Sequence, residues 1–171
     1  MKKGSKLYWF ITIIVIILAV AINGYIIMHS CLDAAESTKA SSSVVEVAED
    51  VVNTVRPETI TPENHDSFAS FIRKAFGHFG LFAVSGLLTS LALYLSLSPF
   101  SWSKHYINVM FSLVVGLFMG IITEMIQLTV PGRSGQVTDV IIDFSGYLLG
   151  TLIIGLILFL IIRKLRKKKS A

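Results

Sequence analysis

The residues best suited to chemistry are charged or polar side chains that stand within or just beside long apolar stretches. Eight residues share this position: Arg73, Lys74, His78, Glu124, Gln127, Arg133, Asp139 and Asp143. Burying a charged group away from water costs free energy unless the group is paired or hydrogen-bonded, so these residues are expected to meet one another or a ligand. His78 adds a side chain that can titrate near neutral pH.

Six of the eight form pairs whose spacing places both members on one face of a helix. The pairs are Lys74 and His78, Glu124 and Gln127, and Asp139 and Asp143. Residues three or four apart are neighbours on a helix surface. Consecutive helices that run in opposite directions bring the three pairs to one level, beneath the short loop that carries Arg133. The spacing therefore predicts one polar cluster.

The residues alone leave three roles open for this cluster. The first is an ion-pair and hydrogen-bond network that holds helices in register. Interhelical polar bonds average only about 0.6 kcal/mol in a measured membrane protein, so this many groups exceed what packing needs. The second is a binding site in which Arg133 and Lys74 meet a phosphate or carboxylate. Glu124 and Asp139 would then meet amines or hydroxyls, and the loop of residues 132–135 would offer backbone amides.

The third role is catalysis, with His78 as a base that Glu124 or Asp139 orients for acyl or phosphoryl transfer. Ser134 and Ser145 are nucleophile candidates by default, because the sequence has no nucleophile elbow, phosphate loop or HExxH motif. A metal could be held by four side chains: His78, Glu124, Asp139 and Asp143. Their spacing is not diagnostic, and we predict neither a metal nor a cofactor. Four short spans without broken halves argue against a proton-coupled transporter.

Four apolar runs must position these residues: 7–28, 75–97, 107–130 and 140–162. The four runs contain no lysine or arginine, and their only histidine or acidic residues are His78, Glu124 and Asp143. At a rise of about 1.5 Å per residue, each run can cross a hydrocarbon core about 30 Å thick. Backbone amides cannot stay unpaired in lipid, so each run is expected to be an α-helix. We predict an all-α integral membrane protein, a bundle of four transmembrane helices.

The composition supports a membrane protein and excludes other classes. Of 171 residues, 53% are hydrophobic and 15% are charged, and the mean hydropathy is +0.71. Soluble domains carry about 25% charged residues, and disordered chains have low hydrophobicity. The basic cluster at residues 163–171 follows a span, which indicates anionic lipid and topology rather than nucleic acid. The single cysteine, Cys31, cannot form an internal disulfide.

The lysines and arginines predict that both termini lie in the cytoplasm. This orientation places ten basic residues inside: Lys2, Lys3, Lys6, Lys104, Arg163, Lys164, Arg166, Lys167, Lys168 and Lys169. Five basic residues (Lys39, Arg56, Arg73, Lys74 and Arg133) and all eleven acidic residues fall on the other side. The excess inside satisfies the positive-inside rule. The first run is longer than the roughly 7–15 apolar residues of a cleavable signal, so we expect an uncleaved anchor.

These boundaries divide the chain into four segments. Residues 1–28 form a cytoplasmic segment and the first anchor, 29–74 an acidic extracytoplasmic loop, 75–162 a three-span core and 163–171 a basic cytoplasmic tail. In the loop, valines at helical spacing from Val44 to Val55 predict a short amphipathic helix that ends before Pro57. Asp66 or Ser67 is expected to cap the helix that enters the second span.

Smaller patterns predict how the helices pack and where they meet the membrane surface. Gly146 and Gly150 indicate a close helix-packing face rather than a dimer signature. Ser145 is expected to face the same polar seam as the cluster. Four aromatic residues near the cytoplasmic boundary are typical of an aromatic belt: Tyr8, Trp9, Trp102 and Tyr106.

The polar residues also carry a family resemblance. Their order is Arg73-Lys74-x-x-x-His78-Phe79, Glu124-x-x-Gln127, Pro131-Gly132-Arg133, and then Asp139 and Gly146. Over roughly residues 70–151 this order resembles the VanZ-like membrane proteins. It departs from them at Asp143, where the family commonly has Asn, and at Phe82, where a Tyr often follows the histidine.

The resemblance implies a bacterial cell-membrane protein of a family named for low-level resistance to the glycopeptide teicoplanin. We therefore expect the protein to contact membrane lipids and to bind or alter an extracytoplasmic ligand that is lipid-linked or a glycopeptide. The resemblance supplies no settled reaction. Whether the protein is an enzyme stays open at this point.

Overall fold

The chain folds into helices. The computed structural model describes residues 5–97 and 102–170, and within these ranges it contains no strand. The elements in chain order are α1 (Lys6–Ser30), α2 (Ala34–Val55), α3 (His65–Ile72), η1 (Arg73–Gly80), α4 (Leu81–Leu97), α5 (Trp102–Gln127) and α6 (Val137–Ser170). Lys2 and Lys3, which contribute to the predicted orientation, lie outside the described residues. So do the side chains of Trp102, Lys104, Arg166, Lys167, Lys168 and Lys169.

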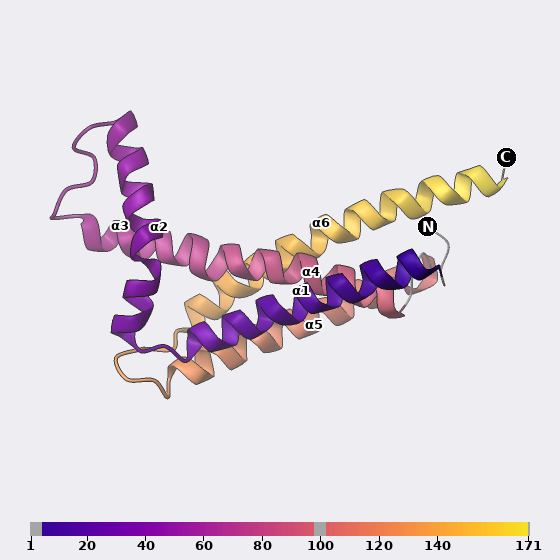
Figure 1. The fold of residues 1–171 in the computed structure, drawn as a ribbon, viewed down its shortest axis with the longest axis horizontal. Helices are drawn as coiled ribbons and strands as arrows, with labels where there is room; N and C mark the ends of the chain where they lie inside the picture. Colours follow the sequence, from indigo (N-terminus) through magenta and orange to yellow (C-terminus); the bar gives the residue numbers. More distant parts are fainter. Residues whose placement is uncertain (1–4, 98–101, 171) are drawn as a thin grey trace.

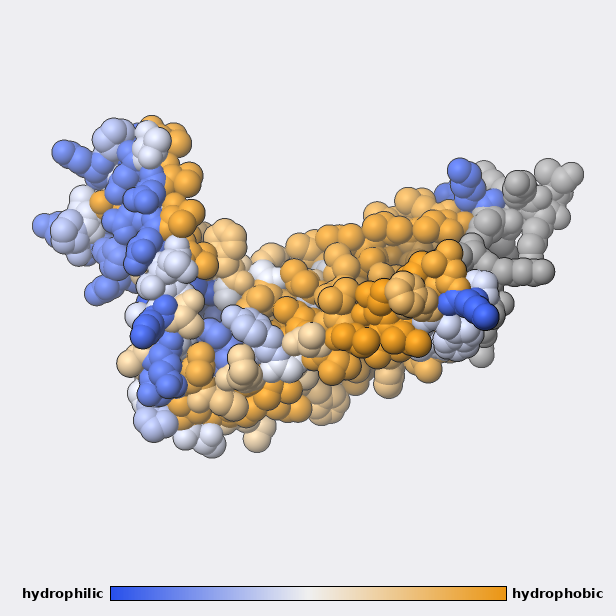
Figure 2. Space-filling view, viewed as in Figure 1, coloured by the Kyte–Doolittle hydropathy of each residue, from blue (hydrophilic) through white to orange (hydrophobic). Residues whose placement is uncertain are grey.

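Four helices are long and apolar enough to cross a membrane, which confirms the predicted number of spans. They are Lys6–Ser30, His65–Leu97, Tyr106–Gln127 and Val137–Lys164. The second combines α3, η1 and α4 into one continuous helix of 33 residues. Figure 2 shows a broad hydrophobic band over the long helices and a hydrophilic end at α2 and α3. This distribution is what a bundle that faces lipid requires.

The long helices pack side by side, and the start of α1 and the end of α6 lie at the end of the bundle opposite α2 (Figure 1). The closest backbone approaches join α6 to η1 and α4. A Cβ added at Gly146 would strike the backbone of Phe79, and one at Gly150 would strike the backbone of Ala83. The two glycines therefore let the helix backbones approach within one chain, which confirms the predicted packing face.

Helix α2 lies across one end of the bundle (Figure 1). It has 22 residues, so the predicted short helix was wrong in length. The cause is a capping box: Asp33 accepts a hydrogen bond from the backbone N–H of Glu36 at 2.8 Å, and the Glu36 side chain accepts one from the N–H of Asp33 at 3.3 Å. This pair satisfies backbone donors at the helix start and carries the helix through the serine-rich stretch.

Helix α2 is anchored to α3 by a small core of Val45, Ala69 and Ile72. His65 also lies 3.5 Å from the carboxylate of Glu49. The predicted cap of the second span was wrong, because α3 begins at His65 and the preceding Asn64 makes no side-chain cap hydrogen bond.

The segment that carries three of the predicted site residues is not an α-helix. Residues Arg73–Gly80 form a π-helical turn, η1, between α3 and α4. Such π-helical segments are rare and occur frequently at functional sites. The spacing of Lys74 and His78 predicted an ordinary α-helix here, so the local geometry differs from the prediction although the two residues remain on one side of the helix.

One residue of the predicted aromatic belt points inward. Tyr8 is completely buried and its hydroxyl donates a hydrogen bond to the carbonyl oxygen of Leu95. Trp9 and Tyr106 are exposed on the surface of the bundle, as a belt requires. Tyr8 therefore joins α1 to α4 and is a correction to the predicted belt.

Candidate functional site

A cavity of about 600 Å³ opens at the end of the bundle where α2 lies. The residues of its wall come from α1, α2, α3, η1, the start of α4, α5, α6 and the loop between α5 and α6. Seven of the eight predicted site residues line it: Arg73, Lys74, His78, Gln127, Arg133, Asp139 and Asp143. The eighth, Glu124, lies against His78 and Asp143 at the edge of the same space. The structure thus brings the predicted polar residues together.

Two contacts between a basic and an acidic side chain connect η1 to α6. The Nζ of Lys74 donates to Asp139 at 2.5 Å, and Nδ1 of His78 lies 3.0 Å from an oxygen of Asp143. Both acids are buried, with 6% and 1% exposure. Because the acids stand one helical turn apart on α6, each faces its own base on η1. The predicted orienting acid of His78 was Glu124 or Asp139, and the structure instead pairs the histidine with Asp143.

Glu124 approaches from α5 and is held by the loop that follows it. The carboxylate is 4% exposed, and one of its oxygens accepts a hydrogen bond from the backbone N–H of Gln136 at 2.8 Å. Among the described residues, its other oxygen has no hydrogen-bond partner. The same is true of the second oxygen of Asp143.

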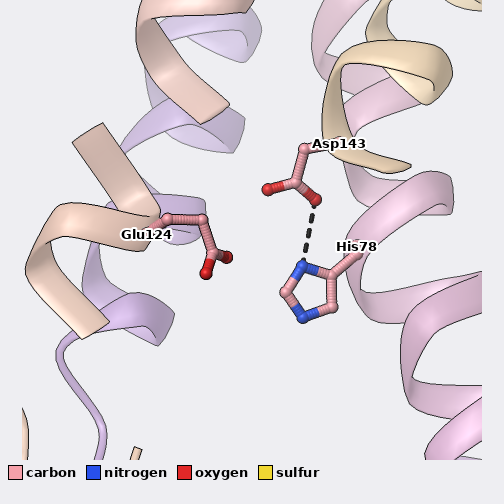
Figure 3. Close-up of side chains that lie close together, drawn as sticks. All are labelled: His78, Glu124 and Asp143. Carbon is pink, nitrogen blue, oxygen red and sulfur yellow. Dashed lines mark hydrogen bonds and ion pairs between the residues drawn. The ribbon is translucent and has the colours of Figure 1, made fainter. Parts of the chain in front are cut away.

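These two carboxylates and the imidazole of His78 form a compact group. One candidate ligand atom from each residue lies within 4.8 Å of the other two. Figure 3 shows the Glu124 carboxylate facing the His78 ring across a gap, with Asp143 on the neighbouring helix. One imidazole nitrogen and two carboxylate oxygens are donors that a divalent ion accepts. We name Lys74, His78, Glu124, Asp139 and Asp143 the charged cluster.

Two arginines line the cavity beside this cluster. Within the part of the chain that the structure describes, neither Arg73 nor Arg133 forms an ion pair. Both are partly buried. The cavity therefore presents two guanidinium groups whose hydrogen-bonding capacity is available, and a guanidinium matches the geometry of a phosphate or carboxylate.

The loop of residues 131–136 owes its shape to its glycines. Gly132 has φ of +73°, a left-handed conformation that side chains other than glycine rarely adopt. A Cβ at Gly135 would lie 2.6 Å from the carbonyl oxygen of Glu124, so only glycine lets the loop press against the end of α5. This contact places the N–H of Gln136 on Glu124. One of the loop amides that was predicted to bind an anion is already engaged, because the N–H of Arg133 donates a hydrogen bond to the carbonyl oxygen of Val130.

Some cavity residues escaped the sequence prediction. His29 and Ser30 from the last turn of α1 line the cavity, as do Ser37 and Ser41 from α2. His29 falls in the segment 29–74 that was predicted to be a loop, whereas the structure places it in the last turn of α1. Its position at the outer end of the first span, at the level of the loop carrying Arg133, is the signal that could have found it.

Of the two candidate serine nucleophiles, one lines the cavity and the other does not. Ser134 is exposed and lines the cavity. Ser145 is exposed and donates a hydrogen bond to the carbonyl of Ile141, four residues back on its own helix. Ser145 follows Asp143 by two residues, so it points to the opposite side of α6, and its predicted place in the polar seam was wrong.

A second polar region lies deeper in the bundle and was not predicted. Four buried hydroxyl residues, Ser90, Ser112, Tyr147 and Thr151, join α4, α5 and α6. Ser90 bonds Ser112 at 2.6 Å and Thr151 at 2.9 Å, and Ser112 donates to the Tyr147 hydroxyl at 3.5 Å. We name these four residues the hydroxyl cluster.

Comparison with known proteins places the chain in a family. Residues 9–160 match the VanZ/LLP1 family. The match extends beyond residues 70–151, so α1 and α2, which help to wall the cavity, belong to the matched region. No curated protein and no solved structure matches the chain. With nearly the whole chain covered and four helices able to span a membrane, the chain is a membrane protein of the VanZ/LLP1 family.

Proposed function

We propose that this protein binds the anionic headgroup of an envelope lipid, or a lipid-linked or glycopeptide ligand, in the cavity at the outer face of the bacterial cell membrane. The observation that carries the proposal is the presence of Arg73 and Arg133 on the cavity wall without ion-pair partners among the described residues. Guanidinium groups held in a partly dry site bind phosphate and carboxylate strongly, because both partners are charged.

The proposed orientation puts both termini in the cytoplasm and the cavity outside. The acidic α2 and the charged cluster then share the outer end, and the basic residues Arg163 and Lys164 lie near the inner end of α6. In this orientation the exposed valines of α2, Val47, Val51 and Val55, rest on the outer membrane surface. A headgroup in the outer leaflet reaches the cavity without crossing the apolar band.

Native mass spectrometry of the purified full chain tests the proposal through the lipids that it retains. The probe is phosphatidylglycerol, with phosphatidylcholine as the zwitterionic comparison. Arg133→Gln is expected to weaken phosphatidylglycerol retention about tenfold, because a hydrogen bond to a charged group contributes about 1.5–3 kcal/mol. The matched control, Arg163→Gln, removes an exposed arginine at the opposite end and should retain the lipid. Equal retention by both variants would contradict the proposal.

Glycopeptide resistance is the cellular effect that follows if the headgroup belongs to an envelope component. Teicoplanin susceptibility is measured in a sensitive host that expresses the wild-type chain or one of four single variants, at matched membrane levels. The variants replace His78, Glu124, Arg133 and Asp139. Each is expected to reduce protection. Four stable and fully protective variants would remove the cavity as the site.

A second candidate function is acyl or phosphoryl transfer on an envelope lipid. The contact between His78 and Asp143 favours it, since a buried acid that orients an imidazole at a cavity wall is a common arrangement of a general base. Ser134 lines the same cavity. Turnover of a purified lipid that is lost in His78→Ala separates this candidate from binding alone.

A further inference from the structure

The charge balance around His78 is incomplete. Lys74 is engaged with Asp139, so the base nearest to Glu124 and Asp143 is the imidazole of His78. A protonated imidazole carries one positive charge, whereas the two carboxylates together carry two negative charges. Two buried carboxylates this close do not both stay ionised without a matching positive charge. A divalent cation bound between the two carboxylates would supply that charge with a neutral imidazole.

The hydrogen bonds of the same group are incomplete in a matching way. Each carboxylate has one oxygen fixed by the protein, Glu124 by the N–H of Gln136 and Asp143 by His78. Each has a second oxygen that is buried and has no partner among the described residues. Buried polar atoms are nearly always hydrogen-bonded or bound to an ion, so two buried carboxylate oxygens without protein partners are typical of an ion-binding site. Figure 3 shows the Glu124 and Asp143 carboxylates on neighbouring helices beside the His78 ring.

We propose that His78, Glu124 and Asp143 form a binding site for a divalent transition-metal ion, with Zn²⁺ as the expected ion. The three ligand atoms lie within 4.8 Å of one another, and shifts of the side chains about their last torsions bring them to the shorter spacing around a bound ion. The imidazole nitrogen favours zinc over magnesium, which prefers an all-oxygen shell. Three protein ligands leave a fourth position open, as in zinc sites that bind water or substrate.

The fourth position faces the cavity, because His78 and Asp143 both line its wall. An oxygen of a phosphate or carboxylate group in the cavity can therefore complete the coordination while Arg73 or Arg133 binds the same group. The metal site does not depend on the proposed lipid ligand. It is present or absent in the purified protein whatever the cavity holds.

Cobalt binding to the full chain tests the site. The protein is purified in mild detergent, stripped of metal with a chelator and titrated with Co²⁺ while the visible d–d absorption is recorded. About one Co²⁺ per chain is expected, and Zn²⁺ should displace it whereas excess Mg²⁺ should not. His78→Ala, Glu124→Gln and Asp143→Asn should each weaken Co²⁺ binding by more than about 100-fold, beyond the roughly 10–100-fold that loss of an outer-shell partner costs.

Asp139→Asn is the matched control. It removes a negative charge one helical turn from Asp143 and leaves the three ligands intact, so Co²⁺ affinity should fall by less than about tenfold. Wild-type protein that binds no Co²⁺ or Zn²⁺ would overturn the proposal and would indicate that a shared proton balances the acids. So would equal losses in Asp139→Asn and Asp143→Asn.

X-ray absorption of the zinc-loaded wild type adds a test that needs no variant. The site predicts one imidazole among otherwise oxygen ligands at about 2.0–2.1 Å. Sulfur in the shell would point to Cys31, and a second imidazole would point to His29, which also lines the cavity. Either result would overturn the assignment.

Discussion

The charged cluster and the hydroxyl cluster lie between the same three helical spans and differ in how completely their groups are satisfied. In the hydroxyl cluster, Ser90, Ser112, Tyr147 and Thr151 bond to one another. In the charged cluster, Glu124 and Asp143 each retain a buried oxygen without a partner among the described residues. The first arrangement is what helix packing needs. The second is expected where a ligand completes the bonding.

The two clusters also differ in access and charge. The hydroxyl cluster is neutral, and its hydroxyl residues are at most 5% exposed. The charged cluster borders a cavity of about 600 Å³, and His78 retains 20% side-chain exposure. A polar contact that only holds helices together gains nothing from an opening. Access to the cavity and net charge therefore distinguish the charged cluster from the hydroxyl cluster.

The substitution with the largest expected effect disrupts both clusters, because it forces α4 and α6 apart. Gly150→Ala places a Cβ against the backbone of Ala83 and Leu87, and overpacking of this kind is expected to cost about 3 kcal/mol. Thermal unfolding in detergent measures the loss. The matched control is Gly155→Ala, whose Cβ would lie 3.5 Å from Val109 in ordinary contact. Equal stability of the two variants would contradict the packing that brings the clusters together.

A smaller effect separates pairing from binding within the charged cluster. Lys74→Met leaves Asp139 buried without its partner and is expected to destabilise the fold by about 1–3 kcal/mol. Adding Asp139→Leu removes the stranded charge and should restore most of the stability. Thermal unfolding and phosphatidylglycerol retention are measured on the same preparations. A double variant that is stable and binds as well as wild type would show that this pair only holds helices together.

The sequence predicted the spans and the level of the charged cluster for a physical reason. Charges are so costly in lipid that Glu124 and Asp143 stand out within apolar runs, and the alternating direction of the helices aligns them. The close approach at Gly146 was predictable in the same way, because small residues at a four-residue spacing permit close packing.

Other features depend on contacts that no local pattern reveals. The π-helical turn at Arg73–Gly80 departs from the α-helical spacing of Lys74 and His78. By contrast, the start of α2 has a local signal that the valine spacing does not use, because Asp33 and Glu36 stand three residues apart, as a capping box requires. The sequence does not predict the hydroxyl cluster, because serine and threonine are common in transmembrane helices and their hydroxyls can also bond a carbonyl of their own helix. His29 lines the cavity because α1 packs beside α4 and α5.

The central claim is that the charged end of the bundle is a site and that the hydroxyl cluster is packing. The most direct test compares two variants in nanodiscs containing phosphatidylglycerol: Arg73→Gln/Arg133→Gln and Ser112→Ala. Unfolding temperature and lipid affinity are read from the same samples. The arginine variant should unfold like wild type and bind at least about tenfold more weakly. Ser112→Ala should lose about 0.6 kcal/mol of stability and bind normally. An arginine variant that binds like wild type, or a Ser112 variant that loses binding without losing stability, would contradict the account.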